Sequence, residues 1–202
     1  SDAECRFEVP LSLFELGGKV RVRDLVKRQD EGTVKETLTY TLPPHSVKIL
    51  RLEAARRLEP TLYEAEWAYL PLYNDLGKQK RIIHPAACDG ASGRMVVSNI
   101  GGSAANVIEW REVYSRRGGE YTMTVSYLAP KGGVREVNDR MIEIAVNGER
   151  QAVVRELAPT GTEGVCRVSV AVRLKPGYNT VSMGSPYTWT PDIDCFTLAP
   201  AE

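Results

Sequence analysis

Two carboxylates spaced i, i+2 stand in an alternating stretch, LYEAEWAYL, residues 62–70. In a strand, side chains two residues apart share a face, so Glu64 and Glu66 would repel each other unless a positive charge lies between them. No Lys or Arg lies inside the stretch. The pair therefore faces open water or holds a cation. A second pair with the same spacing, Asp192 and Asp194, leads into the apolar end of the chain.

Calcium is the cation that such a group would bind, because it takes six to eight hard oxygen ligands from carboxylates, backbone carbonyls and water. Glu64, Glu66 and Asp194 offer three carboxylates, and loop carbonyls could complete the shell. The alternative, which the pattern alone favours, is that both glutamates face solvent on an edge strand. Hydrolysis is a poor interpretation of the pair, because neighbouring i, i+2 carboxylates do not flank a glycosidic bond as acid and nucleophile do.

The loop SPYTWTPD, residues 185–192, has the composition of a sugar-binding loop. A sugar is recognised by an aromatic plane against its C–H face and by fixed polar groups at its hydroxyls. Tyr187 and Trp189 supply aromatic rings and Asp192 a polar group. The alternative is that Trp189 packs over the end of the domain. We expect Trp67 and Trp110, which lie in strand patterns, to belong to the core.

The composition limits the class of protein. The chain has 202 residues, 43% of them hydrophobic, and equal numbers of basic and acidic residues, 26 each. A neutral chain is not steered toward nucleic acid or an anionic membrane. No apolar run reaches the ~18 residues of a membrane span, and no signal peptide is recognised. The four cysteines lack C-x-x-C spacing, which argues against zinc; Cys166 and Cys195 are expected as buried thiols, although a disulfide is possible.

Strand and turn signals recur along the whole chain, so we predict an all-β fold. Residues 1–52 read as a small antiparallel β-sandwich fragment, and residues 53–60 as a linker or one helical turn closed by Pro60. Residues 61–202 read as a larger β-sandwich. Gly119–Leu128 and Cys166–Leu174 alternate clearly, and Asn147-Gly148 between two alternating runs predicts a type I′ hairpin.

The first part resembles a known family. KVRVRDL (residues 19–25), Gly32 and LPPHSVKILRL (residues 42–52) are similar to the C-terminal β-sandwich of family 27 glycoside hydrolases, the α-galactosidase group. That group usually has Trp where this chain has Val26. The opening strands of that sandwich and the catalytic (β/α)₈ barrel have no counterpart here. The resemblance implies an accessory domain next to an upstream catalytic barrel of the same polypeptide.

The second part resembles carbohydrate-binding modules of families 6 and 35. The motifs YEAE, G-x-Y-T-x-x-V-x-Y, VNGE, L-x-x-G-x-N-T-V and P-D-I-D occur in the order of those families. The resemblance implies a jelly-roll β-sandwich and a structural calcium between the E-x-E strand and the last strand. It also implies sugar binding by loops at one end, where Asn99 lies on a Gly-rich loop and Asp192 takes the place of a polar ligand residue. Asn106 is a secondary candidate on the same loop.

We therefore interpret the chain as the non-catalytic C-terminal region of an α-galactosidase-like glycoside hydrolase. It would bind a galactose-containing or uronic-acid-containing glycan and target the enzyme to it. The resemblance also implies an extracytoplasmic location. The competing hypothesis is a structural or protein-interaction β-sandwich that retains calcium and has lost sugar binding.

Overall fold

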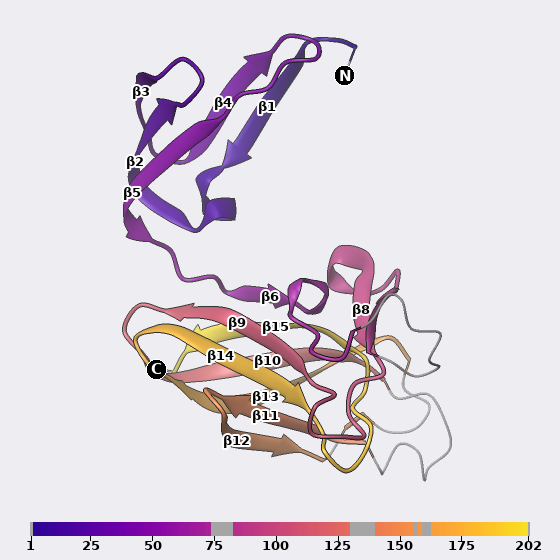
Figure 1. Cartoon of the computed structure of the whole chain (residues 1–202). Coiled ribbons are helices and arrows are strands. Elements are labelled where there is room, and N and C mark those ends of the chain that lie inside the picture. Colours follow the sequence, from indigo (N-terminus) through magenta and orange to yellow (C-terminus); the bar gives the residue numbers. More distant parts are fainter. Residues whose placement is uncertain (1, 74–82, 130–139, 156, 159–162, 202) are drawn as a thin grey trace. The chain divides into compact units, whose positions relative to one another are not determined.

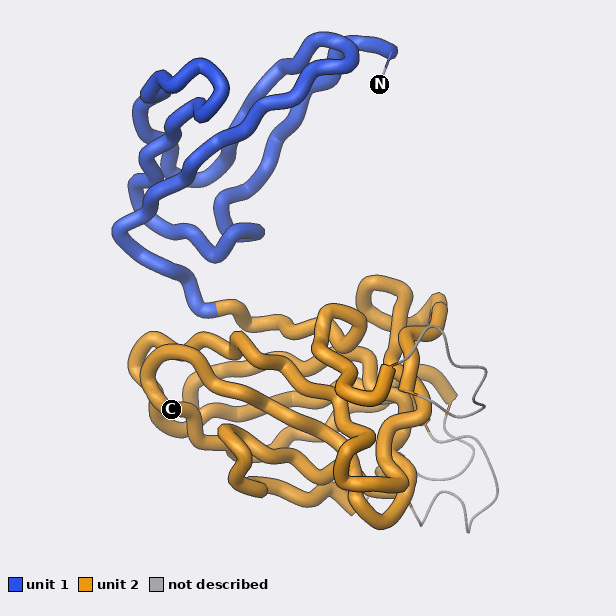
Figure 2. The backbone as a smooth tube through the Cα atoms, viewed as in Figure 1, with its two compact units in different colours: residues 1–59 blue, residues 60–202 orange. Residues whose placement is uncertain are grey.

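The chain forms two separate β-structured units. The computed structural model describes residues 2–73, 83–129, 140–155, 157–158 and 163–201. The two compact units comprise Ser1–Glu59 and Pro60–Glu202 (Figure 2). The predicted all-β class is confirmed, since strands dominate both units (Figure 1). None of the helices within the described ranges has the length and apolar character needed to cross a membrane.

The first unit consists of two small antiparallel sheets. One pairs β1 (Cys5–Pro10) with β4 (Thr37–Leu42), and the 3₁₀ helix η1 (Leu11–Phe14) follows β1. In the other, β2 (Leu16–Asp24) lies between β3 (Gln29–Val34) and β5 (Leu50–Arg57). The linker predicted at 53–60 is wrong over its first five residues. The ladder between β5 and β2 runs as far as the pair Arg57–Leu16, so backbone pairing overrides the polar composition of this stretch.

A polar network joins the strands of the first unit. The Tyr40 hydroxyl donates to Glu31 over 2.6 Å, and the Lys48 ammonium contacts Asp24 at 2.9 Å and Glu31 at 2.6 Å. Asp24 is buried and also accepts the backbone N–H of Lys27. That N–H bond, together with Lys48, lowers the pKa of Asp24. Tyr40 and Glu31 come from different sheets, so the network fastens one sheet to the other.

The second unit is a sandwich of two sheets. One has the order β13-β10-β15-β8-β7, with β6 also paired to β15; the other has the order β12-β11-β14-β9. The strands of the first sheet are β6 (Leu62–Glu64), β7 (His84–Ala87), β8 (Met95–Ser98), β10 (Gly119–Leu128), β13 (Val165–Leu174) and β15 (Ile193–Pro200). The second sheet contains β9 (Ile108–Ser115), β11 (Ile142–Val146), β12 (Glu149–Val154) and β14 (Gly177–Gly184).

Alternating side chains of both sheets fill the core between them. Along β10, the inward positions of the predicted pattern are buried: Tyr121, Met123, Val125 and Tyr127. Phe196 of β15 is fully buried; its ring stacks on Tyr63 and meets the edge of Trp110, with centroids 4.8 Å apart in both pairs. The core position predicted for Trp110 is therefore confirmed.

The structure contains the predicted hairpin and the predicted thiols. Asn147 and Gly148 connect β11 to β12 with φ of 52° and 84°, as a type I′ turn requires. Cys195 is buried and Cys166 is half-buried, and both are free thiols. The interpretation of both as thiols is confirmed, although only Cys195 is fully enclosed.

The stretch LYEAEWAYL is not one strand. β6 ends at Glu64, and the 3₁₀ helix η2 (Ala65–Trp67) follows. β6 pairs with β15 over three residues only, so no ladder holds residues 65–70 extended on this side. The turn places the Trp67 side chain at the surface, where it is 83% exposed. The predicted core position of Trp67 is therefore wrong.

Candidate functional site

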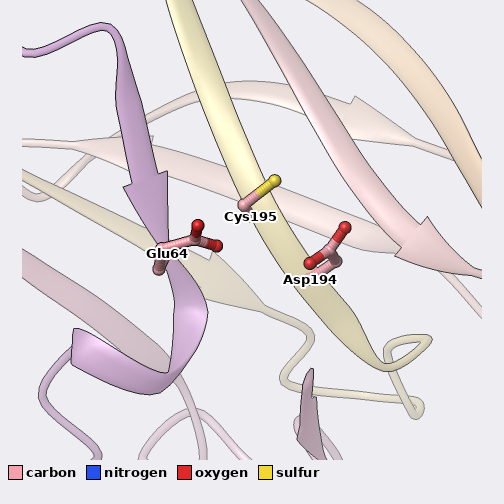
Figure 3. A group of neighbouring side chains, drawn as sticks. All are labelled: Glu64, Asp194 and Cys195. Atoms are coloured by element: carbon pink, nitrogen blue, oxygen red, sulfur yellow. The ribbon is translucent and has the colours of Figure 1, made fainter. Parts of the chain in front are cut away.

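A carboxylate cluster lies where the first strand of the second unit meets the last. β6 and β15 are antiparallel and pair Glu64 with Cys195. Ligand atoms of Glu64, Asp194 and Cys195 all lie within 4.8 Å of one another (Figure 3). Glu64 is 9% exposed and Asp194 3% exposed. The indole N–H of Trp110 donates to the Glu64 carbonyl over 2.9 Å and holds the backbone of that residue in place.

A short turn, the 3₁₀ segment η3 (Ser92–Arg94), closes over the cluster. The Ser92 backbone N–H donates to Asp194 Oδ1 over 2.9 Å, and its hydroxyl donates to Glu64 Oε1 over 2.6 Å. Gly93 has φ of 57°, and a Cβ there would lie 2.4 Å from Glu66 Oε1. The third predicted carboxylate, Glu66, therefore reaches the same turn.

The electrostatics of the cluster favour a bound cation. The Oε2 atoms of Glu64 and Glu66 are buried, and no described residue donates a hydrogen bond to them. Burial raises the pKa of Asp194, and the charges of Glu64 and Glu66 raise it further against the Ser92 N–H bond. Burial and the charge of Glu64 raise the pKa of Glu66. Buried carboxylate oxygens without donors are costly, and a cation would relieve both the repulsion and the missing contacts.

The donor set fits a hard cation such as calcium better than a soft one. The carboxylates of Glu64, Glu66 and Asp194 offer several oxygen atoms, against one sulfur atom of Cys195. Calcium prefers such oxygen donors. Sequence reasoning missed Ser92 and Gly93; the turn composition of residues 89–93, DGASG, is the signal that marks a loop there.

The predicted sugar-site residues lie on two loops that are hydrogen-bonded to each other. Trp189 and Gly101 form an isolated β-bridge, and the Thr190 N–H donates to the Ile100 carbonyl over 2.9 Å. Tyr187 is 86% exposed, whereas Trp189 is half-buried. A Cβ on Gly102 would lie 3.5 Å from the Trp189 ring, so the indole rests on the 99–106 loop. One aromatic ring is thus free in solvent and the other is fixed.

Asn99 belongs to the same pair of loops. Its φ is 59°, and its side-chain amide lies 3.4 Å from His84 Nδ1. Asn106, which is buried, donates to the carbonyls of Asn99 and Gly101 over 2.8 and 2.7 Å and fixes the turn. The Asp192 carbonyl accepts the N–H of Leu128 at the end of β10, and Asp192 itself is half-buried.

Two residues near these loops, Arg140 and His84, were not predicted as site residues. The Arg140 guanidinium donates to the Thr190 carbonyl over 3.0 Å. His84 lies beside Asn99. Periodicity marks neither of them, because each acts through a tertiary contact.

Comparisons with known proteins agree with the two-part organisation. Residues 3–52 match the family described as the alpha galactosidase C-terminal beta sandwich domain. The chain is 26% identical to a family 35 carbohydrate binding module from Clostridium thermocellum, with a TM-score of 0.58, over 68% of this chain and 97% of that one. It is 20% identical to the family 35 module from Paenibacillus barcinonensis, with a TM-score of 0.55, over 70% of this chain and 100% of that one.

A longer alignment relates the chain to an enzyme. An exo-beta-1,3-galactanase from Phanerochaete chrysosporium is 19% identical, with a TM-score of 0.55, over 96% of this chain and 43% of that one. At that identity the likeness concerns the fold alone. No curated protein matches the sequence. The recognition from sequence motifs is thus confirmed: an α-galactosidase-type C-terminal sandwich at residues 3–52 is combined with a fold similar to family 35 modules.

Proposed function

We propose that the second unit is a calcium-stabilised carbohydrate-binding module within the non-catalytic C-terminal region of an α-galactosidase-like glycoside hydrolase. The observation that carries this proposal is the paired-loop arrangement of Tyr187 and Trp189 in a fold similar to family 35 modules. The match of residues 3–52 supports the connection to α-galactosidases. In this role the unit would act beside an upstream catalytic barrel, in an extracytoplasmic location.

Calcium would have a structural role in this unit. Glu64, Glu66 and Asp194 would hold the ion, and the turn at Ser92 would keep two of these carboxylates in position. When bound, the ion would compensate the negative charges of the three neighbouring carboxylates. The result would be a clamp between β6 and β15, the first and last strands of the unit.

The glycan would bind at the loops 99–106 and 185–192. The rings of Tyr187 and Trp189 would lie against the apolar face of a galactose-containing or uronic-acid-containing sugar, and Asp192 and Asn99 would bind its hydroxyls. A shallow site of this kind binds weakly on its own. Joined to a catalytic domain, it raises the effective concentration of substrate there.

Titration calorimetry with galactose, galactomannan and uronic acids tests this function. We expect binding by the chain and its loss in Trp189→Ala. Trp67→Ala is the matched control, since Trp67 is an exposed tryptophan outside the two loops. If none of these sugars binds, or if the Trp189→Ala variant binds as the parent does, the site is not at these loops. We also expect no turnover of a chromogenic α-galactoside.

The alternative function, a structural or protein-interaction sandwich, is favoured by one observation. The Trp189 ring lies against Gly102 and is half-buried, so its packing alone gives it a role. In that case Trp189→Ala would lower the melting temperature, and the parent protein would bind no glycan.

A further inference from the structure

A pocket of about 590 Å³ lies within the first unit, whereas the proposed sugar site lies in the second. Its apolar lining comes from Leu11, Leu16 and Leu58, and Ser12 and Thr37 add hydroxyl groups. The volume falls within the range of small-molecule sites. An apolar lining combined with hydroxyl groups suits a sugar ring, which has one apolar face and several hydroxyls.

The charged lining of the pocket is unbalanced. Lys19, Lys35 and Arg56 line it together with one carboxylate, Glu36. Within residues 2–73, no ion pair involves any of these three cations. The next residue along β5 behaves differently, since Arg57 pairs with Glu15. The pocket therefore carries an excess of positive charge that its own side chains do not neutralise.

A β-bulge shapes this pocket. The register between β2 and β5 shifts between Gly17 and Val20. A Cβ on Gly17 would lie 2.7 Å from Leu58 Cδ2 and 3.1 Å from Arg56 Nε. The missing side chain at Gly17 thus lets both Leu58 and the Arg56 guanidinium lie over the strand at the pocket. A bulge commonly redirects side chains in this way.

We propose that this pocket binds an anionic saccharide, a mono- or disaccharide unit that carries a carboxylate or a sulfate ester. Lys19, Lys35 and Arg56 bind the anionic group through charge-assisted hydrogen bonds. Leu11, Leu16 and Leu58 contact the ring. This pocket lies in the first unit, so its binding of a saccharide does not depend on glycan binding by the second unit.

The test uses the full chain with Trp189→Ala, which removes the proposed site in the second unit. Nuclear magnetic resonance follows the backbone amides of residues 17–19 and 35–37 during titration with glucuronic acid, galactose 6-sulfate, neutral galactose and inorganic sulfate. We expect both acidic sugars to shift these amides and to lose affinity as ionic strength rises from about 0.02 M to about 0.3 M. Neutral galactose and sulfate alone should bind at least about tenfold more weakly.

Charge variants separate a built site from general attraction. Lys19→Ser, Lys35→Ser and Arg56→Ser together should weaken binding of the acidic sugars by about tenfold or more. The control combines Arg6→Ser, Lys27→Ser and Arg51→Ser, which remove the same charge outside the pocket and should leave affinity unchanged. The single variant Lys35→Ser serves if the triple variant unfolds, and should weaken binding by about threefold at an unchanged melting temperature.

Three outcomes would overturn the proposal. Equal weakening by the control triple would mean non-specific attraction. Sulfate binding as tightly as the sugars would mean a simple anion site. Absence of shifts in these amides at the highest acidic-sugar concentration would mean that the pocket binds no saccharide.

Discussion

Replacing Glu64 with glutamine should stabilise the calcium-free protein and remove most of its stabilisation by calcium. Carboxylate oxygens of Glu64 and Asp194 lie within 4.8 Å of each other. At an effective dielectric constant of about 20, two unit charges at that separation repel by on the order of 3 kcal/mol. Glutamine removes this repulsion and still accepts the Ser92 hydroxyl at its Oε1. The calcium-free Glu64→Gln protein should therefore melt above the calcium-free parent.

The size of this gain has an upper limit. The raised pKa of Asp194 and that of Glu66 mean that the parent relieves part of the repulsion by taking up protons. The gain should consequently be largest at alkaline pH, where all three carboxylates are charged. It should shrink as pH falls through the raised pKa values.

Calcium should offset most of the advantage of the Glu64→Gln variant. A ligand at 100 times its Kd stabilises the folded state by about 2.7 kcal/mol. For a domain of this size, 1 kcal/mol corresponds to about 3 °C, so calcium should raise the melting temperature of the parent by about 8 °C. Glu64→Gln should lose most of this increase, because it removes a charged ligand.

Scanning calorimetry in EDTA and in excess calcium, at matched ionic strength, measures both effects. Glu112→Gln is the matched control, since Glu112 is exposed on β9 and lies outside the cluster. Its melting temperature should respond to calcium as that of the parent does. The metal assignment would be refuted if the parent protein had the same melting temperature in EDTA and in calcium. It would also be refuted if calcium raised the melting temperature of Glu64→Gln as much as that of the parent.

Three further predictions concern the fold around the sites. The backbone N–H of Lys27 and the Lys48 ammonium lower the pKa of Asp24. Their contribution to stability is therefore present above the ordinary pKa of an aspartate and is lost as the pH falls through the lowered pKa. Below about pH 4 the melting temperature of the first unit should decrease, and it should decrease less in Asp24→Asn. Gly101→Ala should destabilise the loop pair by about 1–3 kcal/mol, since φ is 98° and the added methyl would lie 2.5 Å from a carbonyl oxygen; denaturant titration measures this. Phe196→Ala should cost about 3–5 kcal/mol by the same assay, because the side chain is fully buried.

Local patterns predicted much of the fold correctly. The alternation along β10 placed Tyr121 and Met123 inside, and Asn147-Gly148 identified the hairpin. Both follow from interactions between residues close together in the chain: the pleat has a period of two, and a type I′ turn requires positive φ at two adjacent residues.

The same alternation failed along LYEAEWAYL because tertiary pairing decides where a strand ends. β6 has β15 as its partner over three residues, and the chain then turns so that Glu66 approaches the Ser92–Arg94 turn. Trp67 leaves the core as a consequence. At the other boundary, pairing with β2 extends β5 to Arg57, through residues whose composition indicates a linker.

The sequence by itself determined the all-β class, the division into two units and the residue types that a calcium site requires. Only the tertiary structure decided which of these residues meet. Glu64 and Asp194 are far apart in the chain and become neighbours through the β6–β15 register, and Ser92 joins them from a third segment. Antiparallel pairing between distant segments has no local pattern in the sequence. Only the folded chain therefore brings Asp194 and the turn at Ser92 to the carboxylate pair of Glu64 and Glu66.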